Sequence, residues 1–287
     1  MKCDTILHHC ISSPMSASDI SRRTFCKWSS SLGVAGFLTG FKSRPLFGLD
    51  FSASEIEIHT PRLIMPAMTK NGAHVPIVAR MNHPLEQKHY IKQIQFLNQS
   101  DPIPSKGIFH PTPANGELYF AFQARMHSGT STVLAIAECN LHGRWTARHR
   151  VTIPEGQGGC ATAGPEKKVS QRENIRPPVI RIPELVRHGR LVKGTTTEVQ
   201  VKFKHPSTTG LAYENKKFVQ VEEPFYLTSM QLFYGDGLVS RYEMTAGLSD
   251  NPFLTLKLKF TEAKPIHVVF TNSLGQQFKA TQEVALS

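Results

Sequence analysis

The chain has 287 residues, of which 40% are hydrophobic and 19% are charged. This composition is typical of a globular protein and excludes intrinsically disordered and collagen-like classes. The formal net charge is +11, but residues 54–287 hold 27 Lys or Arg and 19 Asp or Glu, which leaves +8 spread along the chain. Nucleic-acid-binding proteins cluster their cations and interleave them with aromatic residues, so we expect no nucleic-acid partner.

Residues 1–53 are typical of an export signal. The stretch "SRRTFCK", which begins at Ser21, pairs two arginines and is followed by a weakly apolar run from Trp28 to Phe41. That run is too short to cross a bilayer as a helix. The order of basic and apolar regions predicts a twin-arginine signal, periplasmic localisation and cleavage near Ala53. The alternative is a buried N-terminal helix of a cytoplasmic protein.

Residues 54–153 alternate apolar and polar side chains with a period of two. The alternation is clearest in "ELYFAFQARM" and "RWTARHRVTI", and shorter stretches of the same kind are "IEIH", "HVPIVARM", "YIKQIQFL" and "TVLAIAEC". Asn-Gly and His-Gly pairs separate several of them, as turns do. We therefore predict a β-sandwich over 54–153.

The alternation stops in residues 154–178, which read "PEGQGGCATAGPEKKVSQRENIRPP". Glycine, proline and charged residues dominate, and hardly any side chain could pack in a core. This composition predicts a linker or a long exposed loop.

A second period-two block occupies residues 179–287. It contains "TTEVQVKFKH", "FYLTSMQLFYGDG", "FLTLKLKFTE", "IHVVFTN" and "QFKATQEVAL". No amphipathic helix of a dozen residues stands out after the leader. The fold class is therefore all-β, with two β-sandwich domains joined by a Gly-rich, cysteine-bearing linker.

Cys160 is the candidate functional residue, because it lies in "EGQGGCATAG", where almost no neighbour could shield it. The glycines at 156, 158, 159 and 164 predict a flexible arm. Seven residues separate Ile153 from Cys160, so at roughly 3.3 Å per residue the thiol could reach up to about 20 Å from its domain. The alternative is an ordinary buried cysteine, which is the usual state of a free thiol.

Cys139 ends the apolar stretch "LAIAEC", which favours burial, but a resting-state disulfide with Cys160 is also open. The 13 histidines show no HxH or HxxxH spacing after the leader and no accompanying CxxC pair. We therefore expect scattered surface histidines and neither a metal nor a cofactor.

Several of these stretches resemble known sequences. "HYIKQIQFL", "FHPTPANGELYFAFQARM", "VLAIAE" and "RVTIPEGQGGC" resemble the Y subunit of the SoxYZ sulfur carrier, which ends in a GGCGG motif. "HPSTTGL", "FYGDG" and "NPFLTLKLKF" resemble the Z subunit. The order Y then Z behind a twin-arginine leader is similar to fused SoxYZ-like carriers associated with quinoprotein dehydrogenases. Ala161 and Thr162 stand where the family has two glycines.

The resemblance implies two immunoglobulin-like sandwiches and a covalent carrier, not an enzyme, with sulfur intermediates attached at Cys160. Its implied partners are periplasmic sulfur-oxidation or quinoprotein-linked redox enzymes, as in thiosulfate oxidation. Two alternatives stay open, namely a non-covalent accessory module of a quinoprotein dehydrogenase and a cysteine-dependent enzyme.

Overall fold

The computed structural model describes residues 51–162 and 174–287. The twin-arginine motif and residues 163–173 of the predicted linker, which include Gly164, lie outside the described residues. In the described part of the chain, no helix is long and apolar enough to cross a membrane.

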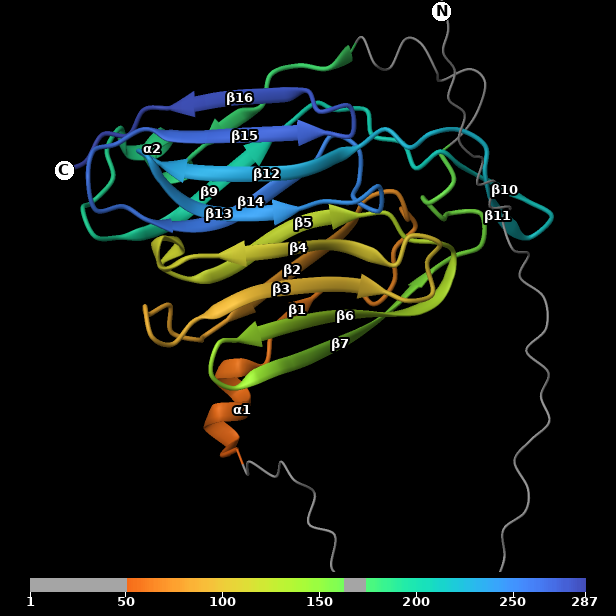
Figure 1. Cartoon of the computed structure of the whole chain (residues 1–287), viewed down its shortest axis with the longest axis horizontal. Coiled ribbons are helices and arrows are strands. Elements are labelled where there is room, and N and C mark those ends of the chain that lie inside the picture. Colours follow the sequence, from red (N-terminus) through yellow and green to blue (C-terminus); the bar gives the residue numbers. More distant parts are fainter. Residues whose placement is uncertain (1–50, 163–173) are drawn as a thin grey trace, which may run out of the picture. The chain divides into compact units, whose positions relative to one another are not determined.

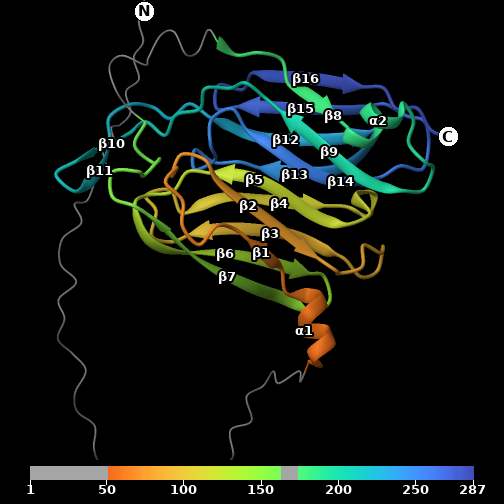
Figure 2. The ribbon, with the colours of Figure 1, turned by 180° about the vertical axis from the view of Figure 1, so that it is seen from behind.

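Two layers of antiparallel strands form the described fold. One is an eight-stranded sheet in the order β16-β15-β12-β13-β4-β3-β6-β7, which faces the viewer in Figure 1. The other is a six-stranded sheet in the order β1-β2-β5-β14-β9-β8, which faces the viewer in Figure 2. A separate hairpin, β10–β11, projects at one end.

The first half of the fold, residues 62–153, contains seven strands. They are β1 (Arg62–Ile64), β2 (Val75–Met81), β3 (Ile91–Asn98), β4 (Ser105–Pro111), β5 (Leu118–Ala124), β6 (Gly129–Cys139) and β7 (Gly143–Ile153). The second half, residues 179–287, contains β8 (Val179–Arg181), β9 (Thr196–Lys202), β10 (Leu211–Glu214), β11 (Lys217–Gln220), β12 (Leu227–Tyr234), β13 (Gly237–Glu243), β14 (Phe253–Lys259), β15 (Ile266–Asn272) and β16 (Gln277–Gln282). Three short helices complete the elements: α1 (Ala53–His59), η1 (Pro113–Asn115) and α2 (Pro183–His188).

The two predicted sandwiches are present, and their sheets are continuous across the junction. In one layer β5 pairs with β14, and in the other β4 pairs with β13. The cores also meet, because Phe120 of the first half packs edge-on against Tyr242 of the second, with ring centroids 4.7 Å apart. The halves therefore share both backbone hydrogen bonds and apolar core.

Period-two alternation places the core as expected. Leu118, Phe120, Phe122 and Ala124 of β5 are buried while the residues between them are not. The same pattern runs through β9, β15 and the end of β7. Side chains on a strand point alternately to opposite faces, so one face of each strand fills the space between the layers.

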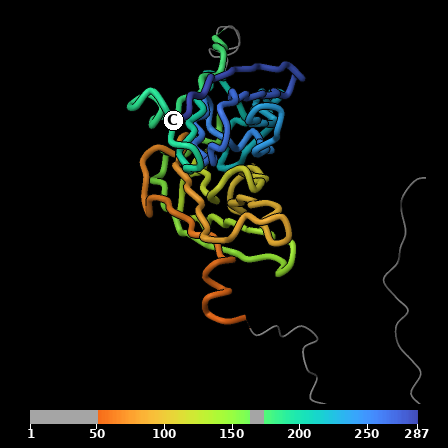
Figure 3. Tube along the Cα trace, turned by 90° about the vertical axis from the view of Figure 1, so that its left-hand side faces the viewer, coloured from red at the N-terminus to blue at the C-terminus, as the bar shows by residue number. Residues whose placement is uncertain are grey.

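One predicted strand is wrong. The stretch "IEIH" belongs to helix α1, which projects from the end of the first half in Figure 3. Ser52 caps this helix: its hydroxyl accepts from the Glu55 N–H, and the Glu55 carboxylate accepts from the Ser52 N–H. Such a capping box satisfies donors at the helix start and outweighs the short alternating pattern. The cleavage predicted near Ala53 coincides with the first residue of α1 and stays a prediction.

Candidate functional site

Residues 154–162 leave β7 by a turn and then pack against the protein. The Gln157 N–H donates to the Pro154 carbonyl at 3.1 Å, and Gly156 takes a positive φ of 77° that favours glycine. Beyond the turn, the Gly72 N–H donates to the Gln157 carbonyl at 2.9 Å. The Gly159 N–H donates to the Met126 carbonyl at 2.8 Å. This segment is therefore held by main-chain hydrogen bonds on both sides.

In the conformation described, Gly158 and Gly159 pack against the protein and do not form a free arm, whereas Gly156 is exposed at the turn. A Cβ on Gly159 would lie 2.2 Å from the Ala73 Cα, and one on Gly158 would lie 2.8 Å from the Ser128 nitrogen. Both positions need glycine because the chain passes too close to its neighbours for a side chain. Gly158 and Gly159 thus allow the cysteine segment to lie directly against the neighbouring main chain. Gly164 lies outside the described residues.

Cys160 is buried, with 2% of its surface exposed, so the outward-facing thiol that the sequence suggested is also corrected. Burial, together with the nearby carboxylate of Asp101, raises the pKa of the thiol to about 12. Lys106 and Arg125 act in the opposite direction but do not compensate. Because only a thiolate is a good nucleophile, the thiol is protonated and unreactive in this state.

A buried ion pair lies near the thiol. The Lys106 ammonium is 2.8 Å from the Asp101 carboxylate, and both side chains are almost wholly excluded from solvent. The ammonium also donates to the Ile103 carbonyl at 2.8 Å, while the carboxylate accepts from the His127 N–H at 2.7 Å. These bonds fix a charged pair inside the wall behind Cys160.

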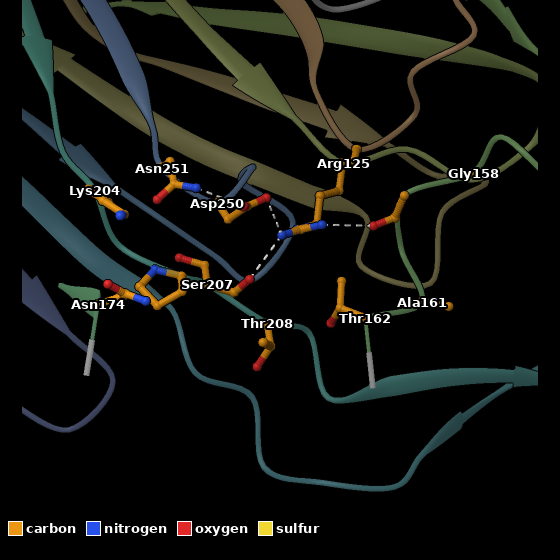
Figure 4. A pocket seen from close by; sticks show the side chains of 13 residues that line it. Arg125, Gly158, Ala161, Thr162, Asn174, Lys204, Ser207, Thr208, Asp250 and Asn251 are labelled. Carbon is orange, nitrogen blue, oxygen red and sulfur yellow. Dashed lines mark hydrogen bonds and ion pairs between the residues drawn. The ribbon is translucent and has the colours of Figure 1, made fainter. Parts of the chain in front are cut away.

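Arg125 connects the cysteine segment with both halves of the fold. It follows β5, and Figure 4 shows its guanidinium pointing towards Ser207 and Asp250 of the second half. It donates to that carbonyl at 3.2 Å, to the Ser207 carbonyl at 2.9 Å and to the Asp250 carboxylate at 2.8 Å. The guanidinium lines a cavity of about 420 Å³ whose wall comes from both halves.

A second cavity, of about 340 Å³, lies beside Cys160 under the β10–β11 hairpin. Tyr213 and Phe218 of the hairpin line it together with His127, and the three rings pack with centroids 4.8 to 5.1 Å apart. The hairpin turns at Asn215 and Lys216, which both have positive φ, as a two-residue hairpin turn requires. The second half thus supplies a cover for the thiol of the first.

Further hydrogen bonds tie the cover and the residues just before it to the cysteine segment. The Thr209 hydroxyl donates to the Cys160 carbonyl at 2.6 Å. The Thr162 N–H donates to the Leu211 carbonyl at 2.9 Å. These bonds join residues 209–211, at the start of the hairpin, to residues 160–162 of the cysteine segment.

Cys139 is not the redox partner of Cys160. Both cysteines are free and buried. Cys139 lies at the end of β6 beside the start of β7, whereas Cys160 follows the far end of β7. The 11 residues of β7 span about 35 Å, far beyond the Cα separation of roughly 7 Å that a disulfide allows.

The sequence predicts scattered surface histidines, but the structure buries several of them. His59, His83 and His205 are buried. His59, His89 and His142 gather around Cys139, with one ligand-type atom of each residue within 4.8 Å of the others. Two spacings could have signalled this cluster: Cys139 and His142 are three positions apart, and His83 and His89 are six apart.

Other site residues gave no signal in the sequence. Asp101, Lys106 and Arg125 stand in unremarkable stretches, and nothing in "LAYENKKFVQ" distinguishes a cover from any other hairpin. Their roles arise from contacts between residues far apart in the chain, which a period-two pattern does not encode.

Comparison with protein-family models gives two matches in the order expected. Residues 51–160 match the sulfur oxidation protein SoxY, and residues 186–283 match the sulphur oxidation protein SoxZ. The SoxY match ends at Cys160. A search of curated proteins finds no match.

Comparison with solved structures gives matches with low TM-scores. A superoxide reductase (neelaredoxin) from Ignicoccus hospitalis is 26% identical over 36% of this chain and 88% of its own, with a TM-score of 0.32. The reduced enzyme from Archaeoglobus fulgidus is 22% identical over 34% and 92%, with a TM-score of 0.25. The Ig1–Ig2 segment of Dpr2 is 10% identical over 79% and 99%, with a TM-score of 0.23. Scores this low carry no argument about function.

The two family matches together cover most of the described residues and follow the two halves of the fold. The chain therefore belongs to the SoxYZ sulfur-oxidation proteins, with a SoxY and a SoxZ domain fused in one polypeptide.

Proposed function

We propose that this protein is a covalent carrier of small sulfur species, which are attached to the thiol of Cys160 and presented to partner enzymes. The observation that carries the proposal is the position of Cys160. It is the last residue of the SoxY match, and it lies where that domain, the following segment and the SoxZ hairpin meet. The cavity of about 340 Å³ beside the thiol has room for a group the size of a sulfonate.

The buried thiol implies that the carrier works by opening and closing. In the conformation described, Tyr213 and Phe218 cover the cavity and the raised pKa keeps the thiol protonated. Loading therefore requires displacement of the β10–β11 hairpin, which exposes Cys160 and restores an ordinary thiol pKa near 8.5. Closure would then shield the attached group from other thiols, which can exchange with a sulfur–sulfur bond.

Loading with thiosulfate balances as a two-electron oxidation. The Cys160 S–H bond breaks, the outer sulfur of thiosulfate forms a bond to the cysteine sulfur, and one proton and two electrons leave. The electrons pass to a redox partner protein, and the product is a cysteine S-thiosulfonate. The carrier needs no catalytic base of its own, because its contribution is tethering, which raises the effective concentration of the group at each partner.

We propose that this chemistry takes place in the periplasm after twin-arginine export, with sulfur-oxidation or quinoprotein-linked enzymes as partners. The leader places an arginine pair before an apolar run, and this order supports the periplasmic location. A cysteine-dependent enzyme would turn over its substrate without any added partner, whereas a carrier would not.

The test is mass spectrometry of the protein taken from cells grown on a reduced sulfur compound. We expect a reductant-sensitive sulfur adduct on the peptide that contains Cys160 and none on the peptide that contains Cys139, which serves as an internal control. The Cys160→Ser variant should carry no adduct and support no sulfur oxidation with partners present. A bare Cys160 in such cells, or full activity of Cys160→Ser as an accessory module predicts, would contradict the proposal.

A further inference from the structure

Four elements at the far end of the first half bring imidazole and thiol groups together. His59 ends helix α1, His89 lies between β2 and β3, Cys139 ends β6, and His142 lies in the turn to β7. We call these four residues the histidine–cysteine cluster. They come from positions up to 83 residues apart, yet their donor atoms lie within 4.8 Å of one another.

The nitrogen atoms of the cluster converge on one point. His59 Nε2 lies 2.9 Å from His142 Nδ1 and 3.2 Å from His89 Nε2. His59 Nδ1 lies 2.6 Å from the Glu55 carbonyl, so this nitrogen carries the proton and Nε2 presents a lone pair to its neighbours. A main-chain carbonyl that fixes the tautomer in this way is the usual outer partner of a metal-ligating histidine.

Cys139 completes the cluster with a soft ligand. Its sulfur lies 3.6 Å from His142 Nδ1 and accepts from the Leu141 N–H at 3.5 Å. The residue is buried, with 2% of its surface exposed. The main-chain N–H fixes the position of the sulfur, and cysteine sulfur is a ligand that Fe²⁺, Co²⁺ and Zn²⁺ accept.

His83 supplies an independent observation. It is 95% buried, and its Nε2 has no hydrogen-bond partner among the described residues. Its Nδ1 lies 2.6 Å from the Pro84 carbonyl, so Nε2 is again the lone-pair nitrogen. The ring packs against His89 and His59, with centroids 4.3 and 4.8 Å away. A buried acceptor without a partner is costly, and a ligand would explain it.

Aromatic rings enclose one side of the cluster. Trp145 stacks on His59 at 5.0 Å, and Phe51 packs edge-on against Trp145 and His142. These rings exclude water from one side of the cluster.

We propose that the histidine–cysteine cluster binds one divalent first-row transition-metal ion, with His83 as a fifth ligand. Imidazole and thiolate together suit ions such as Fe²⁺, Co²⁺ and Zn²⁺ and disfavour Mg²⁺ and Ca²⁺. This site goes beyond the carrier function: β7, about 35 Å long, separates it from Cys160.

The test uses tag-free protein stripped with a chelator and titrated anaerobically with Co²⁺, and then with Fe²⁺ and Zn²⁺. We expect one equivalent of Co²⁺ to bind and to give a thiolate-to-metal charge-transfer band. Cys139→Ser should lose that band. His89→Gln, at a partly exposed position, should weaken binding on the order of 100-fold or more. His83→Gln should alter the ligand-field spectrum of the bound ion.

Two controls make the test specific. His188→Gln, at an exposed histidine of α2, should leave affinity and spectrum unchanged. Cys160→Ser should also bind one equivalent, so that failure of the carrier proposal and of this one can be told apart. Absence of stoichiometric binding of all three ions would overturn the proposal, as would equal binding by folded wild type and His89→Gln.

Discussion

At the scale of single residues, the protein places full charges where water is excluded. Lys106 and Asp101 are buried together in the wall behind Cys160. A buried pair is weak evidence for stability by itself, because desolvation offsets most of the attraction. Loss of one partner is different, since the remaining charge then has no counterion.

Lys106→Met should therefore lower the free energy of unfolding by about 3 to 5 kcal/mol, because it leaves the Asp101 carboxylate buried and unpaired. Lys92→Met is the matched control. Its exposed pair with Glu138, at 3.4 Å, should contribute less than about 1 kcal/mol. Urea denaturation of both variants measures the difference. Equal losses would show that the buried pair has no special role.

The thiol of Cys160 should make stability depend on pH. Its pKa is raised to about 12 in the fold, whereas an unfolded cysteine titrates near about 8.5. Between these values the folded protein holds a proton that the unfolded chain has released. The stabilisation is thus complete below about pH 8.5 and is lost as the pH rises towards about 12.

Between about pH 7 and about pH 10, wild type should therefore lose about 2 kcal/mol more stability than Cys160→Ser. Comparing the two proteins at both pH values cancels the fixed cost of the substitution and the titration of other groups. Parallel pH profiles would argue that the thiol is accessible to water.

At the scale of elements, the short β10–β11 hairpin controls the access of water to Cys160. Neighbouring residues of β11 face opposite ways: Phe218 lines the cavity beside Cys160, while Val219 is exposed. Since burial raises the thiol pKa, contacts on one face of this hairpin control the reactivity of a residue in the other domain.

Phe218→Ala should increase the rate at which a thiol reagent modifies Cys160 by at least about tenfold, because it loosens the cover and lets water approach the sulfur. Val219→Ala, on the opposite face of the same strand, should leave the rate near that of wild type. The rate is measured at pH 8 by peptide mapping, which separates Cys160 from Cys139. Unchanged rates in Phe218→Ala would mean that another element covers the thiol.

The sequence predicts most of the strands but not the helix α1 or the packing of the glycines. Alternation located β5, β7, β9 and β14 because one face of each strand fills the core. It failed at "IEIH", where a capping box favours α1. The glycines before Cys160 predict a flexible arm, but a glycine required by close approach and a glycine required by motion look the same in a sequence. Only the neighbour, Ala73, distinguishes them.

At the scale of the whole molecule, the two domains share both sheets, so no cut between them leaves the strand pairing intact. Pairing of β5 with β14 and of β4 with β13 makes each sheet continuous. Cutting at this junction would expose four strand edges, which promote aggregation. The two halves should therefore unfold as one cooperative unit.

Leu256→Ala tests this cooperativity, because the residue is buried in β14 directly opposite Phe120 of β5. The cavity should cost about 2 to 5 kcal/mol. In a Trp28→Phe background, fluorescence reports Trp145 of the first half alone, since the chain has 2 tryptophans. The fluorescence and far-UV circular dichroism midpoints should move together. An unmoved Trp145 transition would mean that the halves unfold independently.

Fusion of the two domains in one chain has its largest effect at low protein concentration. Separate subunits dissociate on dilution, and a thiol on one subunit would then lose a cover that the other subunit supplies. Here the covalent connection fixes the stoichiometry at one to one and makes assembly intramolecular, so its equilibrium is independent of concentration. Cys160 and the hairpin that covers it therefore remain together at any concentration of the protein.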